Sequence, residues 1–120
     1  MEPRVDTAMT FEFSSPARAI ELLQARRPEF SLTEAGEQST SFDWTRKYPA
    51  GHWSPLAAFG GRQIVGDITV EPRSLVVRAH ALSMAARLAE TLKLLLGPEL
   101  RLRSVHWHDI SGNVEKRAEL

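Results

Sequence analysis

Residues 83 to 97 of the chain read SMAARLAETLKLLLG and have the pattern of one amphipathic helix. Its apolar residues recur every three or four positions, which places them on one side of an α-helix. Ser83 stands where a helix N-cap is expected, and Gly97 followed by Pro98 ends the helix. The predicted stripe consists of Met84, Leu88, Leu92 and Leu95, widened by Ala85, Ala89 and Leu96. A stripe this wide needs a sheet to cover, so strands are expected on both sides of the helix.

The segments that flank this helix alternate with the period of β-strands. In residues 63–70 one side of the strand holds Ile64, Gly66, Ile68 and Val70. A turn at Pro72-Arg73-Ser74 leads into residues 75–82, whose inward side holds Leu75, Val77, Ala79 and Ala81. Residues 101–108 form a last strand with an ambiguous inward face, for which Val105 and Trp107 compete with Leu102, His106 and Ile110. This pattern predicts a β-hairpin, a helix and a strand, with the helix across one face of a mostly antiparallel sheet.

The rest of the chain is expected to add a smaller helix and further strands. Residues 10–13 alternate as a short strand, and a helix is predicted over 16–27, with Ser15 as its cap and Pro16 in its first turn. Residues 31–40 have the composition of a loop, while 41–47 form a strand with Phe42, Trp44 and Arg46 on one face. An aromatic-rich loop follows, and then a short strand over 56–59.

These segments predict one α+β domain over residues 1–120, built as a small, mostly antiparallel sheet with two helices around a β-β-α-β core. Its expected parts are a flexible arm (1–9), a strand and first helix (10–30), the sheet and central helix (41–110), and a polar tail (111–120).

Composition excludes several classes of function. The 15 Lys and Arg residues balance the 15 Asp and Glu residues, which argues against strong sequence-independent nucleic-acid binding. There is no cysteine, so disulfides, thiolate catalysis and cysteine-based zinc sites are excluded. No apolar run is long enough to span a membrane, and the first residues lack the pattern of a signal peptide. We therefore expect a cytoplasmic protein that does not bind membranes and holds no cofactor.

The same central stretch carries a family resemblance. It is similar to a group of bacterial proteins with no assigned reaction, some of which carry the zinc-chelating motif known from the tail of the SecA translocase. The residues that carry the likeness are Gly66-Asp67-Ile68-Thr69-Val70, Ser74-Leu75-Val76-Val77-Arg78-Ala79, Ser83, Ala86-Arg87-Leu88 and Leu95-Leu96-Gly97. The resemblance implies an α+β accessory domain. The metal-binding part of such proteins is absent here, because the chain has no cysteine.

Histidines form the one candidate metal site. His106 and His108 stand two apart on a predicted strand, so both rings lie on the same face, and His80 comes from a strand that can neighbour it. Asp109 is adjacent. The simpler interpretation is that these rings decorate a strand end while Trp107, between them, turns into the core.

Three hypotheses of function follow. The first is a non-enzymatic interaction module that binds a protein partner, or a second copy, through the sheet face left open by the helices. The second is a single-strand nucleic-acid binder that uses the same face, with basic and aromatic residues at Arg78, His80, Arg101, Arg103, Trp107 and Trp53. The third is a small metal-dependent enzyme. It has the least support, because the sequence holds no nucleophile motif or glycine-rich phosphate loop.

Overall fold

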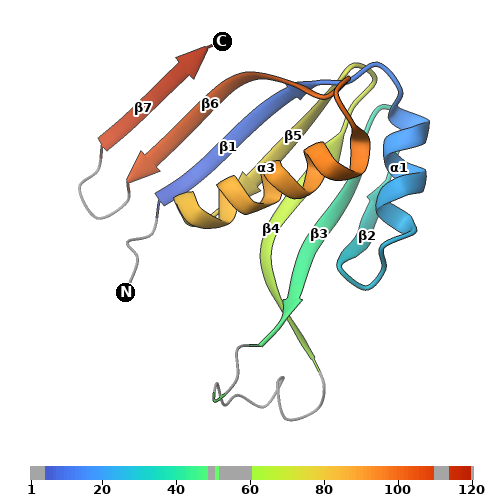
Figure 1. Cartoon of the computed structure of the whole chain (residues 1–120), viewed down its shortest axis with the longest axis horizontal. Coiled ribbons are helices and arrows are strands. Elements are labelled where there is room, and N and C mark those ends of the chain that lie inside the picture. Colours follow the sequence, from blue (N-terminus) through green and yellow to red (C-terminus); the bar gives the residue numbers. More distant parts are fainter. Residues whose placement is uncertain (1–4, 49–50, 52–60, 110–113, 120) are drawn as a thin grey trace.

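The computed structural model describes residues 5–48, 51, 61–109 and 114–119. Their helices and strands are, in chain order, β1 (Val5–Glu12), α1 (Pro16–Gln24), β2 (Phe30–Ala35), β3 (Thr40–Lys47), β4 (Arg62–Val70), β5 (Ser74–Ala79), α3 (Leu82–Leu96), β6 (Arg101–Asp109) and β7 (Val114–Glu119). The seven described strands form one sheet in the order β2-β3-β4-β5-β1-β6-β7, and every pairing is antiparallel (Figure 1). The predicted α+β class, with two helices on an antiparallel sheet, is confirmed.

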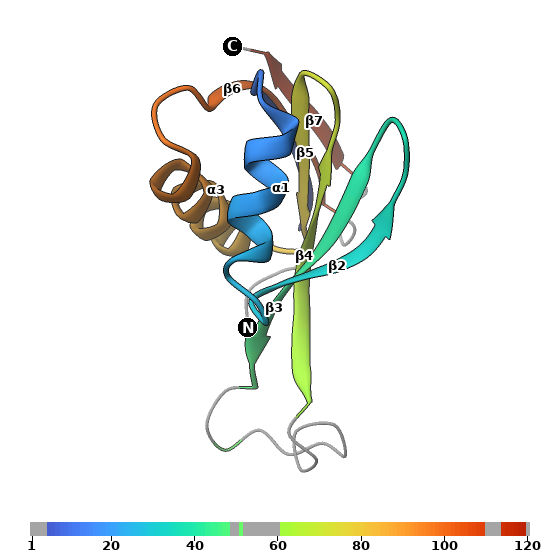
Figure 2. The same cartoon turned by 90° about the vertical axis from the view of Figure 1, so that its right-hand side faces the viewer.

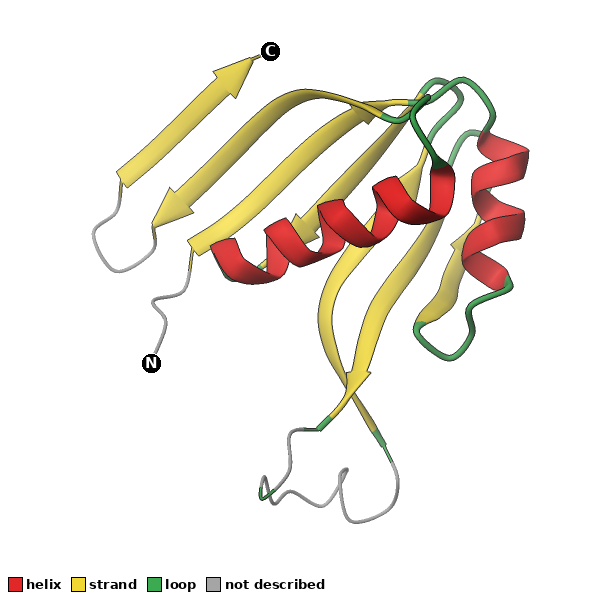
Figure 3. Ribbon diagram, viewed as in Figure 1, coloured by secondary structure: helices red, strands yellow, loops and turns green. Residues whose placement is uncertain are grey.

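Both helices cover the same side of the sheet (Figures 2 and 3). The buried stripe of α3 consists of Ala85, Leu88, Leu92 and Leu96, while Met84 and Leu95 are partly buried beside it. It belongs to one core cluster with the predicted sheet residues Ile68, Val70, Leu75, Val77 and Ala79. Helix α3 therefore docks where the sequence places it, but rotated slightly, so that Leu96 replaces Leu95 in the core.

Both helices differ from the prediction at one end: α1 begins at Pro16 as predicted but ends at Gln24 and not at residue 27, and α3 differs at its N-terminus. Helix α3 begins at Leu82, with Ala81 in the N-cap position, so Ser83 lies in the first turn and is not the cap. In α1 the proline stands at the first turn as predicted, but the Ser15 side chain makes no capping hydrogen bond. Helix α3 ends as expected, with Gly97 in the C-cap position. Gly97 has a positive φ of 87°, and its N–H donates to the Lys93 carbonyl at 2.9 Å.

Three segments predicted as irregular are strands. Residues 5–9 of the expected arm belong to β1, which lies between β5 and β6. The expected loop over 31–40 contains β2, and the expected polar tail contains β7. Strands β2 and β7 are the two edges of the sheet, where one side of the backbone and most side chains face water, so they lack the apolar alternation that identifies buried strands. The strand predicted over 56–59 lies outside the described residues.

Register shifts decide which side chains enter the core. The β3–β4 register shifts between Trp44 and Thr45, and as a result Val65 is buried whereas Ile64, predicted to face inward, is 61% exposed. A second shift, between Thr10 and Phe11 of β1, resolves the ambiguity in β6. It allows Leu102, Val105 and Trp107 to share the side of the sheet that carries the helices, opposite Phe11, Met9 and Thr7.

Gly66 of β4 lies in a confined space between its two neighbouring strands, beneath α3. A Cβ at this position would stand 2.6 Å from the Arg78 carbonyl oxygen and 3.3 Å from a ring carbon of Trp44, with Leu88 of α3 at 3.6 Å. The Arg78 carbonyl and the Trp44 ring on the two neighbouring strands therefore leave no room for a Cβ, so glycine is the residue that fits there.

Truncation of a core residue in α3 tests how the helix docks. Leu92→Ala is expected to lower the free energy of unfolding by about 2–5 kcal/mol, because Leu92 is fully buried. Leu94, on the same helix, is 88% exposed, so Leu94→Ala should change it by less than about 0.5 kcal/mol. Chemical denaturation measures both. An unchanged midpoint for Leu92→Ala would show that α3 is docked elsewhere.

A methyl group at position 66 tests the close approach. Gly66→Ala is expected to lower the free energy of unfolding by about 1–3 kcal/mol, since the strand must shift away from the Arg78 carbonyl. Ordinarily alanine replaces glycine in a strand without loss, so wild-type stability in thermal unfolding would contradict the packing described above.

Candidate functional site

The side of the sheet opposite α1 and α3, here called the open face, is covered by no helix of the described residues (Figure 2). Strand alternation places there the residues between the buried positions of each strand. Six of them stand in direct cross-strand register and form what we call the charged row: Asp43, Asp67, Arg78, Ala8, His106 and Arg117. Two carboxylates occupy its β3–β4 end, and a histidine and an arginine occupy its β6–β7 end.

Ion pairs compensate most charges of the open face. Arg78 lies 3.4 Å from Asp67, and the Nδ1 atom of His80 lies 2.9 Å from an oxygen of Asp6. At the basic end, Arg117 contacts Glu119 at 2.8 Å on the same strand. A guanidinium has five N–H donors, so one carboxylate leaves Arg117 with capacity for a second.

Asp43 is the exception. It stands directly opposite Asp67 on the adjacent strand, and like charges in this position destabilise a sheet. Partial burial, and then the charge of Asp67, raise the pKa of the Asp43 carboxyl above its ordinary value of 3.8. On its other side Asp43 faces Ser31 of β2, which offers no charge.

The three predicted metal-binding histidines do gather on the open face. His80, His106 and His108 line one hollow of about 280 Å³ together with Asp6, Asp67 and Arg78. Asp109 pairs with Val5, so strand alternation puts it on the other side of the sheet. Within the residues that the structure describes, no group of three or more His, Asp or Glu side chains is placed to hold a metal ion. The metal site stays a prediction without a ligand cluster behind it.

The predicted nucleic-acid residues are divided between several environments. Trp107 is half-buried on the helix side of the sheet, opposite Thr7, so it offers no stacking surface on the open face. The reason is strand alternation, which turns His106 and His108 to the open face and Trp107 between them away from it. Arg101 is exposed on β6, and Trp53 lies outside the described residues. Arg78 and His80 lie on the open face, each beside a carboxylate.

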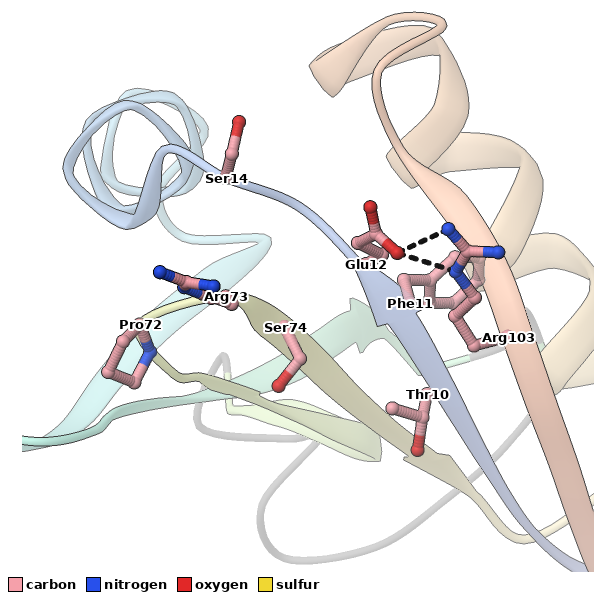
Figure 4. Close-up of a pocket in the computed structure, with 8 residues that line it drawn as sticks. All are labelled: Thr10, Phe11, Glu12, Ser14, Pro72, Arg73, Ser74 and Arg103. Atoms are coloured by element: carbon pink, nitrogen blue, oxygen red, sulfur yellow. Dashed lines mark hydrogen bonds and ion pairs between the residues drawn. The ribbon is translucent and has the colours of Figure 1, made fainter.

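Arg103 lines a hollow of about 700 Å³ at the end of the open face formed by β1, β6 and the β4–β5 turn (Figure 4). Its Nε donates a 2.7 Å hydrogen bond to Glu12, and a second nitrogen contacts the same carboxylate oxygen. The guanidinium of Arg73 stands apart from this pair, beside Pro72. The hollow therefore presents a neutralised ion pair and one separate cation, with no acid–base or nucleophilic constellation among its lining residues.

Asp43, Asp67 and Arg117 were not among the predicted site residues. Strand alternation in the sequence predicts that Asp43 and Asp67 each face away from the core. The sequence does not predict that they are neighbours, because this depends on the register between β3 and β4.

Comparisons of the chain with protein-family models, with curated proteins and with solved structures find no match. Neither helix of the described residues combines the length and apolarity that a membrane crossing requires.

Removing the charge of Asp43 tests the like-charge contact. Because the folded chain keeps the Asp43 proton to a higher pH than the unfolded chain does, stability falls as the pH rises from 3.8 through the raised pKa and carries the whole penalty above it. Asp43→Asn should therefore raise the free energy of unfolding at neutral pH, by about 0.2–1 kcal/mol. The gain should vanish near pH 3, where the wild-type carboxyl is protonated in both states.

Urea unfolding of dilute protein measures this gain at both pH values. Glu37→Gln, at an exposed turn residue, is the control and should change stability at neither pH. A loss of stability for Asp43→Asn at neutral pH would mean that the carboxylate has a favourable partner in the folded chain.

Proposed function

We propose that this chain is a non-enzymatic interaction module whose open face binds a second copy of the chain, face to face. The observation that carries the proposal is the placement of Asp43 beside Asp67 at one end of a row whose other end is basic. In an isolated chain the contact between these two carboxylates lowers the stability of the fold, and no favourable contact offsets it among the described residues. A cation supplied by a partner would compensate it.

The order of charges in the row selects the geometry. Sheets that stack face to face align their strands within about 30°. If the two-fold axis runs along the strands, between β5 and β1, then Asp43 of one copy lies over Arg117 of the other, and Asp67 lies over His106. A two-fold axis across the strands would instead place Asp43 over Asp43. Charge complementarity therefore supports the first arrangement, in which each contact occurs twice.

Residues near that axis are small or uncharged for the most part, which favours close contact between two copies. Ala8 and Arg78 stand at its centre, and the neighbouring row is uncharged from Ser41 to Ser104: Ser41, Thr69, Val76, Thr10 and Ser104. Six strands about 4.8 Å apart and about 20 Å long offer roughly 500 Å² per copy. This is the scale of the smaller specific interfaces, so we expect weak and reversible self-association.

A nucleic-acid strand on the same face is the second hypothesis. It has less support, because Arg78, His80 and Arg103 each have a carboxylate beside them, and a phosphate backbone would have to displace it.

Charge exchange across the open face tests the proposal. Asp43→Arg and Arg117→Glu should each abolish self-association, because each sets like charges against one another twice. An equimolar mixture of the two variants should associate again, since both contacts are then between opposite charges. Sedimentation velocity over a range of protein concentrations measures all three samples.

Glu21→Arg, on the exposed surface of α1, is the matched control and should associate like the wild type. A monomeric wild type at every concentration, or variants that associate like the wild type, would overturn the proposal. Salt-sensitive binding of labelled single-stranded DNA or RNA by that monomer would favour the second hypothesis instead.

A further inference from the structure

A separate pocket, of about 380 Å³, lies on the other side of the molecule between β3, β4 and α3. We call it the basic pocket, because four cationic side chains line it: Arg46, Lys47, Arg62 and Arg87. They come from three different elements, so the fold and not local sequence brings them together.

Two of these guanidinium groups are held in place by neutral acceptors. The Nε of Arg46 donates to the Gln63 side-chain oxygen at 3.0 Å, and its Nη1 lies 3.8 Å from the Met84 sulfur. Arg62 donates from Nε to the Thr45 hydroxyl at 2.9 Å and from Nη2 to the Thr45 carbonyl at 3.3 Å. These bonds orient the guanidinium groups without neutralising their charge.

Elsewhere in the described chain several arginines pair with carboxylates, as in Arg18–Glu99, Arg26–Glu29, Arg78–Asp67, Arg103–Glu12 and Arg117–Glu119. No such pair joins Arg46, Arg62 or Arg87 to a carboxylate of the described residues. Two acids do line the basic pocket, but Glu29 is engaged by Arg26 at 2.6 Å, and Glu90 is exposed on α3. Positive charge therefore exceeds negative charge in this pocket, in a chain whose net charge is zero.

We infer that the basic pocket binds the phosphate dianion of a small molecule. Oriented guanidinium groups match the oxygens of a phosphate group through paired hydrogen bonds, and the excess of positive charge suits a dianion better than a carboxylate. Trp44 and Met84 supply an apolar wall, against which an organic group attached to the phosphate can lie. Free phosphate and a phosphate monoester share this chemistry, and the experiment below separates them.

Nuclear magnetic resonance of the ¹⁵N-labelled full chain gives a local test. The Trp44 indole N–H lies at the basic pocket, 3.5 Å from a Glu29 oxygen, so its resonance should shift saturably on addition of inorganic phosphate at constant ionic strength. The Trp107 indole, on β6, should not shift. Tighter binding of phenyl phosphate than of inorganic phosphate would identify a monoester as the ligand, and the reverse order would identify free phosphate.

Variants distinguish phosphate binding in this pocket from general attraction of phosphate to a positively charged surface. Arg87→Gln, at an exposed position of α3, should weaken phosphate binding about tenfold, as loss of one charge-assisted hydrogen bond does. Arg46→Gln should act in the same direction. Arg101→Gln removes another exposed arginine, which lies outside the pocket, and should leave the affinity unchanged.

Three results would overturn the inference. They are a Trp44 resonance that does not respond to phosphate, equal affinity for acetate or dimethyl phosphate, and equal weakening by Arg101→Gln and Arg87→Gln. Because Arg87 faces water on a helix surface, its replacement leaves the folded core intact, and the test does not depend on Arg46→Gln being stable.

Discussion

The apolar stripe of α3 is buried across β1, β4 and β5, and this contact constrains how the strands around it are connected. The chain enters α3 from β5 and leaves it into β6, and these two strands are both antiparallel to β1. They are therefore parallel to one another, and the helix must cross the strand between them. The N-terminal strand fills that position, and its Met9 and Phe11 complete the floor beneath the helix. Gly66 fits beneath the helix, where a Cβ would meet the Arg78 carbonyl of the neighbouring strand.

This packing determines on which face of the sheet the polar residues lie, as well as the apolar ones. Because α1 lies on the same side as α3, no helix of the described chain covers the opposite face, and every second residue of the inner strands points there. Register then decides which charges become neighbours. Asp67 meets Arg78 on one side and Asp43 on the other, so one carboxylate is satisfied while its neighbour is not. A chain optimised only for stability would not keep Asp43, which is why we place the interaction surface there.

The sequence was sufficient wherever a segment is amphipathic and its partner is close along the chain. The period of Leu88 and Leu92 predicts α3, and the alternation of Val77 and Ile68 with the turn after Val70 predicts the hairpin. Contacts between distant segments could not be predicted from the sequence. The polar edge strands β2 and β7 are strands because they pair with β3 and β6. Two register shifts bury Val65 in place of Ile64 and turn Leu102 to the core side. The candidate site is the part of the structure that the sequence predicts least well. Alternation gives the face of Asp43, but only register gives its neighbour.

Net charge is a poor guide to this molecule for the same reason. The balance of acidic and basic residues over the whole chain argues against strong sequence-independent nucleic-acid binding, but it does not show how the charges are distributed. Folding distributes the carboxylates unevenly: three of the open face lie beside Arg78, His80 and Arg103, whereas among the described residues Arg46 and Arg62 donate to neutral acceptors. A guanidinium held by neutral groups keeps its attraction for an anion and has already lost much of its rotational freedom, so binding costs less entropy. An overall neutral chain can therefore carry a local excess of positive charge, and in the described residues that excess lies where neutral acceptors orient the arginines.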